Sequence, residues 1–437
     1  MRLITLLSLG VAIVSITVYY IRANNQHDAN NAKQTDSATS MQLIAGLPNP
    51  SGRCPKPRLD WNSPIRQTRF PSVGERICLY MTQWYDPDYG TAQQWKPMLS
   101  FRQEDHLTLE IYWNNVLLHI VEMEERHLMN DVPFFVTKDN QTLIKSLSGQ
   151  KHWILFVCYG RDTENICKKF NNSSSSNNNH PLLFVWGDQE TKIDVHLPIV
   201  GKWRFNNIDD HTRPAPILLP LDYNRHYGQL KDVKAHDIAW ENKKNEAVWR
   251  GGMTGIIEGG KFVYNYEVKK TPAETCLKFE RCRLVYRNQD TVGSDIGFSS
   301  CQEEALITIE GVHMMRPVLT TKEQLEYKML ISIEGNDVAT GLKWNLLSSS
   351  VVLMPRPMKS IFSMEFLLEP WVHYVPLDVD NIGKAIQWVL EHDEEAQRIS
   401  QRATNFIEDL FLHPDSEKDN DDVAQEIANR ITALWAI

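Results

Sequence analysis

Short apolar runs alternate with amphipathic stretches along the chain. Runs rich in Val, Ile, Leu and Phe predict β-strands, several of them apolar on both faces. The candidate strands are His152–Tyr159, Pro181–Trp186, Glu246–Trp249, Met329–Ile333, Ser350–Met354 and His373–Pro376. Helical spacing of apolar positions predicts helices over Leu107–Glu125, Gly341–Ser348, Ile382–His392, Glu394–Leu412 and Asp421–Ala436. This alternation predicts an α/β fold with mainly parallel sheets, whose ligands bind at the carboxyl ends of the strands.

The chain begins with an apolar run that carries no charge from Leu3 to Ile21, between Arg2 and Arg22. As a helix, with a rise of about 1.5 Å per residue, it would span roughly 28 Å, close to the hydrocarbon core of a bilayer. A cleaved signal peptide is the alternative, although its apolar region is usually shorter, about 7–15 residues. We predict a signal anchor or transmembrane helix over residues 1–21.

Two further features agree with a membrane-anchored, luminal body. Residues 22 to about 60 are rich in Asn, Gln, Ser, Thr and Pro, which predicts a flexible stem that we place over 22–75. Asn140, Asn171 and Asn172 each begin a glycosylation sequon. We therefore expect a single-pass type II protein of the Golgi or endoplasmic reticulum membrane.

Composition narrows the classes of function. The chain is 42% hydrophobic, enough for a buried core, and its net charge of −9 argues against broad nucleic-acid binding. The chain has 7 cysteines and no C-x-x-C pair, which argues against a zinc site. In an oxidising lumen, up to three disulfides are plausible with one cysteine left over, and their pairing stays open.

Two loops after predicted strands carry groups suited to a phosphate. Arg250, Gly251, Gly252 and Thr254 follow the strand at Glu246–Trp249, where glycines allow close backbone approach and an Arg offers a fork of donors. The alternative is a tight turn with a surface Arg. In the second loop, Gly335 and Asn336 precede a helix expected to start near Thr340, with Lys343 in its first turn. The alternative here is a capped helix with a solvated Lys.

Other candidates concern proton transfer and metal binding. Asp188 follows the strand Pro181–Trp186, where a carboxylate is well placed as a general base, or is simply a turn residue. Arg225 and His226 lie together after an apolar segment, although a single His is more often structural. Two D-x-D triplets, Asp86–Asp88 and Asp378–Asp380, resemble a proline-containing turn and a helix N-cap respectively. We therefore expect no bound metal.

The region from about Phe184 to Phe406 resembles glycosyltransferase family 90. The motifs that carry the resemblance are Tyr327-Lys328, Ile331–Asp337, Leu342-Lys343-Trp344, Ser348–Pro355, Met364-Glu365 and Glu369–Pro376, with Arg225–Tyr227 and Trp249–Gly251 before them. Their order and spacing are most similar to the lipopolysaccharide-transferase branch. One departure is Gly341, where many members of the family carry an Arg.

The resemblance implies a GT-B fold, in which two Rossmann-like domains face a cleft, usually without a metal. The domains would be 76–240 on the acceptor side and 241–437 on the nucleotide-sugar side. A family member would use UDP-sugar as its substrate, with no cofactor. Arg250 and Lys343 would then stabilise the diphosphate, Glu365 would contact the donor sugar or ribose, and Asp188 would match the catalytic base.

We therefore predict a glycosyltransferase that moves a hexose or pentose from a UDP-sugar to a luminal protein or glycan acceptor, with inversion and without a metal. Its partners would be the nucleotide sugar, the acceptor and the membrane, and not nucleic acid. Three alternatives stay open: an inactive glycan-binding or scaffold protein of the same fold, raised by Gly341; a metal-dependent transferase that uses Asp86 and Asp88; and an unrelated luminal α/β protein.

Overall fold

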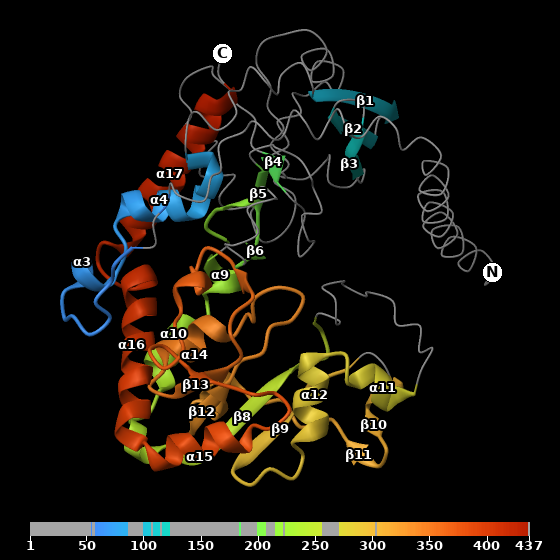
Figure 1. The fold of residues 1–437 in the computed structure, drawn as a ribbon, viewed down its shortest axis with the longest axis vertical. Coiled ribbons are helices and arrows are strands. Elements are labelled where there is room, and N and C mark those ends of the chain that lie inside the picture. The colour runs from blue at the N-terminus through green and yellow to red at the C-terminus, as the bar shows by residue number, and fades with distance from the viewer. Residues whose placement is uncertain are drawn as a thin grey trace, which may run out of the picture. The chain divides into compact units, whose positions relative to one another are not determined.

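The computed structural model describes the residues that Figure 1 draws in colour. They are residue 54 and residues 57–85, 99–105, 108–113, 116–122, 183–184, 199–206, 215–221, 223–255, 271–301 and 304–435. The predicted membrane anchor, the three sequons and the strand predicted at His152–Tyr159 lie outside them. No helix among the described residues is long and apolar enough to cross a membrane.

The described fold contains a five-stranded parallel sheet in the order β15–β13–β12–β8–β9, and Figure 1 labels four of its strands, β8, β9, β12 and β13. Its strands are β8 (Lys244–Gly252), β9 (Ser294–Ser300), β12 (Tyr327–Ile331), β13 (Val351–Met354) and β15 (Val375–Pro376). Every residue of β12 and β13 is buried, because both faces of the sheet are covered. The predicted α/β class with parallel strands is confirmed, and the last four strands predicted from the sequence all lie in this sheet.

Helices on the two faces of the sheet create two hydrophobic cores. They are α12 (Glu280–Arg287), α14 (Leu342–Leu347), α15 (Gly383–Glu391) and α16 (Asp393–Phe411). On β13, Val352 packs in the core that contains α14 and α16, whereas Val351 packs in the core that contains α12 and α15. Successive strand residues point to opposite faces, so one short apolar strand contributes to both cores.

The strand order creates a switch point between β8 and β12. After β8 the chain places β9 on one side, and it later returns to place β12 on the other side of β8, with Leu330 opposite Val248. The connections that leave the carboxyl ends of these neighbours therefore diverge. In open parallel sheets, this divergence leaves a crevice in which ligands bind.

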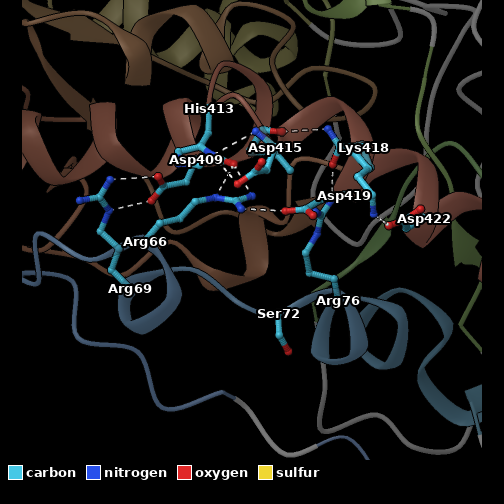
Figure 2. Close-up of polar contacts among 12 residues, drawn as sticks. Arg66, Arg69, Ser72, Arg76, Asp409, His413, Asp415, Lys418, Asp419 and Asp422 are labelled. Carbon is cyan, nitrogen blue, oxygen red and sulfur yellow. Dashed lines mark hydrogen bonds and ion pairs between the residues drawn. The ribbon is translucent and has the colours of Figure 1, made fainter.

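The N-terminal described segment packs on the last two helices of the chain. It contains α3 (Arg66–Arg69), α4 (Val73–Met81) and η3 (Thr82–Tyr85), and α4 lies against α17 (Ser416–Trp435). Figure 2 shows the polar contacts: both oxygens of the Asp409 carboxylate accept hydrogen bonds from Arg69, at 2.7 and 2.9 Å, and Arg66 pairs with Asp419 at 2.7 Å. Residues 57–75, which we expected in the stem, thus belong to a packed element. The predicted domain boundaries stay predictions.

The helix predicted over Leu107–Glu125 is wrong. This stretch forms strands β2 (Thr108–Trp113) and β3 (Val116–Glu122), which make an antiparallel sheet with β1 (Leu99–Asp105). In its first half, Leu109, Ile111 and Trp113 recur with period two, and β-branched and aromatic side chains favour a pleated strand. A long apolar segment of this composition satisfies both patterns, and cross-strand pairing decides between them.

The remaining strands are short. They are β4 (Leu183–Phe184), β5 (Ile199–Gly201) and β7 (Ile217–Leu218) in one parallel sheet, β6 (Arg204–Phe205) paired with β14 (Lys359–Ser360), and β10 (Thr308–Ile309) paired with β11 (Val312–His313). The other helical segments are α9 (Tyr223–His226), α10 (Leu230–His236), η4 (Trp240–Asn242), α11 (Pro272–Cys276), η5 (Glu304–Leu306), α13 (Thr321–Gln324) and η6 (Glu365–Leu367). The β6–β14 pair joins a segment near residue 205 to the loop after β13.

The other sequence predictions of helices agree with α14, α15, α16 and α17, the last of which starts at Ser416 rather than Asp421. Asp378 does not cap α15; its carboxylate accepts from the Asp380 backbone N–H in the preceding turn. Disulfides link Cys54 with Cys78 and Cys276 with Cys282.

Candidate functional site

A small pocket of about 40 Å³ lies at the carboxyl ends of β12 and β13. We call it the β12–β13 pocket. Ser332 and Glu334 line it after β12, Ala339 and Leu342 line it at the start of α14, and Arg356 follows β13. This volume is far below the roughly 300–1,000 Å³ usual for small-molecule sites, so the pocket marks a shallow part of the surface rather than a closed cavity. Its position agrees with the sequence prediction that ligands bind beyond the strands.

Arg281, from α12, ties the loop after β8 to the loop after β12. It donates to the Gly252 carbonyl at 3.1 Å and the Thr254 hydroxyl at 2.7 Å, and also to the carbonyls of Ile333 and Glu334 at 2.9 and 3.1 Å. Burial lowers the pKa of this guanidinium to about 10, although the side chain stays positive at neutral pH. The two loops at the switch point are therefore held together around a fixed positive charge.

Gly335 allows this bridge to form. A Cβ built at this position would lie 2.8 Å from the Thr254 hydroxyl oxygen and 2.9 Å from Arg281 Nη2, closer than real Cβ atoms approach their neighbours. The sequence-predicted residues Gly252, Thr254 and Gly335 are thus brought together by a residue that was not predicted. Gly251 precedes them at the end of β8.

Glu334 and Lys359 tie the loop after β12 to the loop after β13. One carboxylate oxygen of Glu334 accepts from the backbone N–H groups of Met358 and Lys359, at 2.8 and 3.0 Å. The Lys359 ammonium donates back to the carbonyls of Gly335 and Asn336, at 3.1 and 3.2 Å. Burial raises the pKa of Glu334 to about 7 and lowers that of Lys359, while each charge opposes the shift of the other.

The segment around β5 and β6 also reaches this loop. Lys202 pairs with Asp337 at 2.7 Å, and both side chains are largely buried. The Asn206 amide donates to the carbonyls of Pro357 and Lys359. Residues from the first half of the chain therefore meet the loops that follow β12 and β13.

Arg250 is engaged by protein groups. Its Nη2 donates to both carboxylate oxygens of Asp295, at 2.8 and 2.9 Å, and Nε donates to the Pro317 carbonyl at 2.8 Å. Its Nη1 donates to the carbonyls of Trp249 and Asp295. All five N–H groups of the guanidinium thus have acceptors, and a phosphate would have to displace one of them.

Lys343 and Glu365 are both buried, with 2% and 1% of their surface exposed. Lys343 donates to the Ala339 carbonyl at 3.3 Å, and Glu365 accepts from the Ile361 N–H at 2.9 Å. Burial lowers the pKa of Lys343 and raises that of Glu365, and each charge partly offsets the other's shift. The contacts described for Lys343 and for Arg250 share no residue, so the structure does not join these two predicted cations.

The Glu365 carboxylate is only partly paired. Its second carboxylate oxygen has no hydrogen-bond partner among the described residues, and the preceding Met364 has a left-handed backbone, with φ of 57°. A non-glycine residue in that region carries a local strain of about 1–3 kcal/mol. The backbone just before Glu365 is therefore held by its surroundings in a conformation that a non-glycine residue does not favour.

The remaining predicted residues are placed as follows. His226 is buried at the end of α9, with Arg225 exposed beside it. Asp188 lies outside the described residues, and so do Asp86 and Asp88. Within the described part of the chain, no group of three or more His, Cys, Asp or Glu residues could hold a metal ion. The expectation of a metal-independent site stays a prediction.

Sequence reasoning missed Arg281, Lys359, Lys202 and Arg356. The sequence pattern could have indicated Arg356, because this residue comes shortly after an apolar strand and lies between Pro355 and Pro357. The other three gain their roles from contacts between segments far apart in the chain. No local pattern marks such residues.

The chain is similar to a known protein family and to several known proteins. The model of glycosyl transferase family 90 matches residues 101–415. O-glucosyltransferase LpsA of Dichelobacter nodosus is 38% identical over 203 residues, which cover 46% of this chain and 53% of that protein. Protein O-glucosyltransferase 2 of Danio rerio is 36% identical over 85 residues, 18% of this chain and 16% of that protein. Protein O-glucosyltransferase 1 of Homo sapiens is 23% identical over 171 residues, 38% of each chain.

The chain thus spans about half of the first of these relatives and a smaller share of the other two. The family model, in contrast, covers well over half of the chain and includes every loop that lines the β12–β13 pocket. The resemblance found in the sequence is confirmed, and the protein belongs to glycosyl transferase family 90.

Proposed function

We propose that this protein transfers a sugar from a UDP-sugar to a protein or glycan acceptor and that the donor binds in the β12–β13 pocket. The observation that carries the proposal is the position of this pocket beside the switch point of a parallel sheet, in a chain of this family. The names of three similar proteins specify O-glucosyl transfer, so UDP-glucose is the first donor to test.

We also propose the finer architecture. A second Rossmann-like domain within 76–240 would face the sheet described above, as in a GT-B fold. The parallel strands β4, β5 and β7 support this arrangement, and so does the contact of Lys202 with Asp337. An acceptor held by the first half of the chain would then lie close to the loops that bind the donor.

The proposed reaction is a single displacement with inversion. The acceptor hydroxyl loses its proton to Asp188 and its oxygen bonds to the anomeric carbon. The bond from that carbon to the phosphate oxygen breaks, and UDP leaves with the electron pair. Arg281 and Lys359 fix positive charge beneath the loops, where it stabilises the charge that develops on the leaving diphosphate. We propose no metal in this step.

The direct test is a donor screen. Purified full-length protein in detergent is incubated with a panel of UDP-, GDP- and CMP-sugars, with and without a chelator, and released nucleotide is measured. We expect release of UDP from one UDP-sugar, unchanged by the chelator. Release from no donor, together with no binding of UDP, would contradict the proposal.

A second candidate is an inactive glycan-binding or scaffold protein of the same fold. One structural observation favours it: both cations predicted from the sequence are already engaged, Arg250 by Asp295 and Lys343 by its burial. This candidate predicts saturable glycan binding without turnover of any donor. Transfer above the level of a heat-denatured sample would exclude it.

Membrane attachment is also a proposal. Residues 1–21 would anchor the protein in the Golgi or endoplasmic reticulum membrane, with its catalytic body in the lumen. Protease digestion of sealed microsomes tests the topology, and we expect the body to be protected until detergent is added. Digestion without detergent would place the body on the cytosolic side.

A further inference from the structure

Arg356 occupies a stiff loop at the edge of the β12–β13 pocket. It lies two residues after the end of β13, between Pro355 and Pro357, whose rings fix the backbone φ on both sides. Met358 and Lys359, which follow Pro357, are held in place because their backbone N–H groups donate to the Glu334 carboxylate. The side chain of Arg356 is exposed and lines the pocket, so it is presented from a fixed backbone.

The guanidinium of Arg356 differs from the other cations near this site. Arg250, Arg281 and Lys359 donate to carboxylates, hydroxyls and carbonyls of the protein. No hydrogen bond or ion pair of Arg356 occurs within the described part of the chain. Its guanidinium is exposed beside the pocket, and its charge opposes the rise that burial causes in the pKa of Tyr374.

Carboxylates around the pocket oppose an anionic ligand. Glu280 and Glu334 both line it, and although burial raises the pKa of Glu334 to about 7, their remaining negative charge would repel a diphosphate. The ammonium of Lys359 is fully buried and donates to two carbonyls. Its charge therefore reduces this repulsion, but it does not contact the ligand directly. An exposed Arg offers the planar fork of donors that matches two phosphate oxygens.

We propose, on the basis of the function proposed above, that Arg356 binds the diphosphate of the donor directly and stabilises the charge of the departing UDP. When the bond between the anomeric carbon and the phosphate oxygen breaks, the electron pair stays on that oxygen. Arg356 donates to this phosphate, while the acceptor's proton goes to the general base. The sequence predicted Arg250 and Lys343 for this contact. In this proposal they have structural roles instead.

The test compares variants of the full-length protein for binding of UDP and of uridine, which lacks the phosphates. Arg356→Gln removes the charge, and Arg356→Lys keeps a point charge without the fork. Arg287→Gln is the matched control, because Arg287 is exposed on α12 and does not line the pocket. Thermal unfolding of each variant shows whether the fold is kept, and we expect the same midpoint for all of them.

Loss of one charge-assisted contact predicts weaker UDP binding by roughly ten- to a hundredfold in Arg356→Gln, and a similar loss of kcat/KM. Uridine binding is expected to be unchanged, and Arg356→Lys is expected to recover part of the UDP affinity. Arg287→Gln is expected to match the wild type. UDP binding by Arg356→Gln within about twofold of the wild type would overturn the inference.

The outcomes separate this inference from the proposed function. If the wild type binds UDP through Arg356 but transfers no sugar from any donor, the proposed function fails and the diphosphate contact stands. If the wild type transfers sugar and Arg356→Gln does so equally well, the inference alone fails. If the wild type binds neither UDP nor a UDP-sugar, both fail.

Discussion

Replacing Arg281 by Met would separate the two loops at the switch point. The Ile333 carbonyl, at a residue that is 1% exposed, would lose both of its Arg281 donors, at 2.9 and 3.2 Å. A buried acceptor left unpaired costs about 1–3 kcal/mol. The carbonyls of Gly252 and Glu334 lie at partly exposed residues and can take water instead, so they add less.

Two effects of opposite sign decide the net change for Arg281→Met. The lost hydrogen bonds together destabilise the fold by about 2–4 kcal/mol. Removal of a partly buried charge offsets some of this loss, because burial already disfavours that charge and lowers the pKa of Arg281 to about 10. We therefore expect a decrease of about 2 kcal/mol in the free energy of unfolding, measured by urea denaturation.

Arg287→Met is the matched control for Arg281→Met. Arg287 is exposed on the same helix, and we expect its replacement to change stability by less than about 0.5 kcal/mol. UDP binding should weaken by more than about tenfold in Arg281→Met, because small displacements of binding loops are costly. If the two variants were equally stable and bound UDP equally, the Arg281 bridge would not hold the site together.

Three further changes test other contacts. Burial raises the pKa of Glu334 to about 7 from 4.5, so the contribution of this group to stability is complete below pH 4.5 and is lost as pH rises through about 7. In Glu334→Gln, the free energy of unfolding measured in urea should therefore depend less on pH across that range. The same pH dependence as in the wild type would contradict this. Gly335→Ala should reduce both the free energy of unfolding and the affinity for UDP, because its Cβ would lie 2.8 Å from the Thr254 hydroxyl oxygen. Wild-type values in urea denaturation and in UDP titration would show that the loop accommodates the methyl group without loss of stability. Asp409→Asn leaves Arg69 without its charged partner and should lower the free energy of unfolding by about 3 kcal/mol, and a loss under about 0.5 kcal/mol would mean that α3 is held by other contacts.

The sequence predicted the central sheet well because its strands are short and apolar on both faces. β12 and β13 are fully buried, so no polar position interrupts the run. β9 was missed because its sequence, Ser294–Ser300, contains more small polar residues than large apolar ones and lies at the edge of the sheet. The segment Leu107–Glu125 fitted both a helix and a strand, and pairing with β1 decided between them.

The candidate site was predicted in position but not in detail. Strand ends located the loops of Gly252, Thr254 and Gly335, because parallel sheets bind ligands there. Which cation serves which loop depends on contacts between distant segments, as the bridge from Arg281 to Ile333 shows. Sequence spacing cannot show that the guanidinium of Arg250 is already occupied.

The stem prediction shows a related limit. The prediction rested on residues 22 to about 60, which are rich in Asn, Gln, Ser, Thr and Pro, and it extended the stem to residue 75. Residues 57–75 pack instead. They pack because Arg66 and Arg69 find carboxylates more than 300 residues later, at Asp419 and Asp409. The ordering of this segment therefore depends on partners that its own sequence does not reveal.

The location of the donor site can be measured directly by amide hydrogen exchange of the full-length protein with and without UDP. If UDP occupies the β12–β13 pocket, exchange should slow in residues 332–342 and 354–360, the two loops that line it. Helices α16 and α17, which are remote from these loops in sequence, serve as the internal reference and should not change. Unchanged exchange in both loops at saturating UDP, or slowing confined to another region, would contradict a donor site at the ends of β12 and β13.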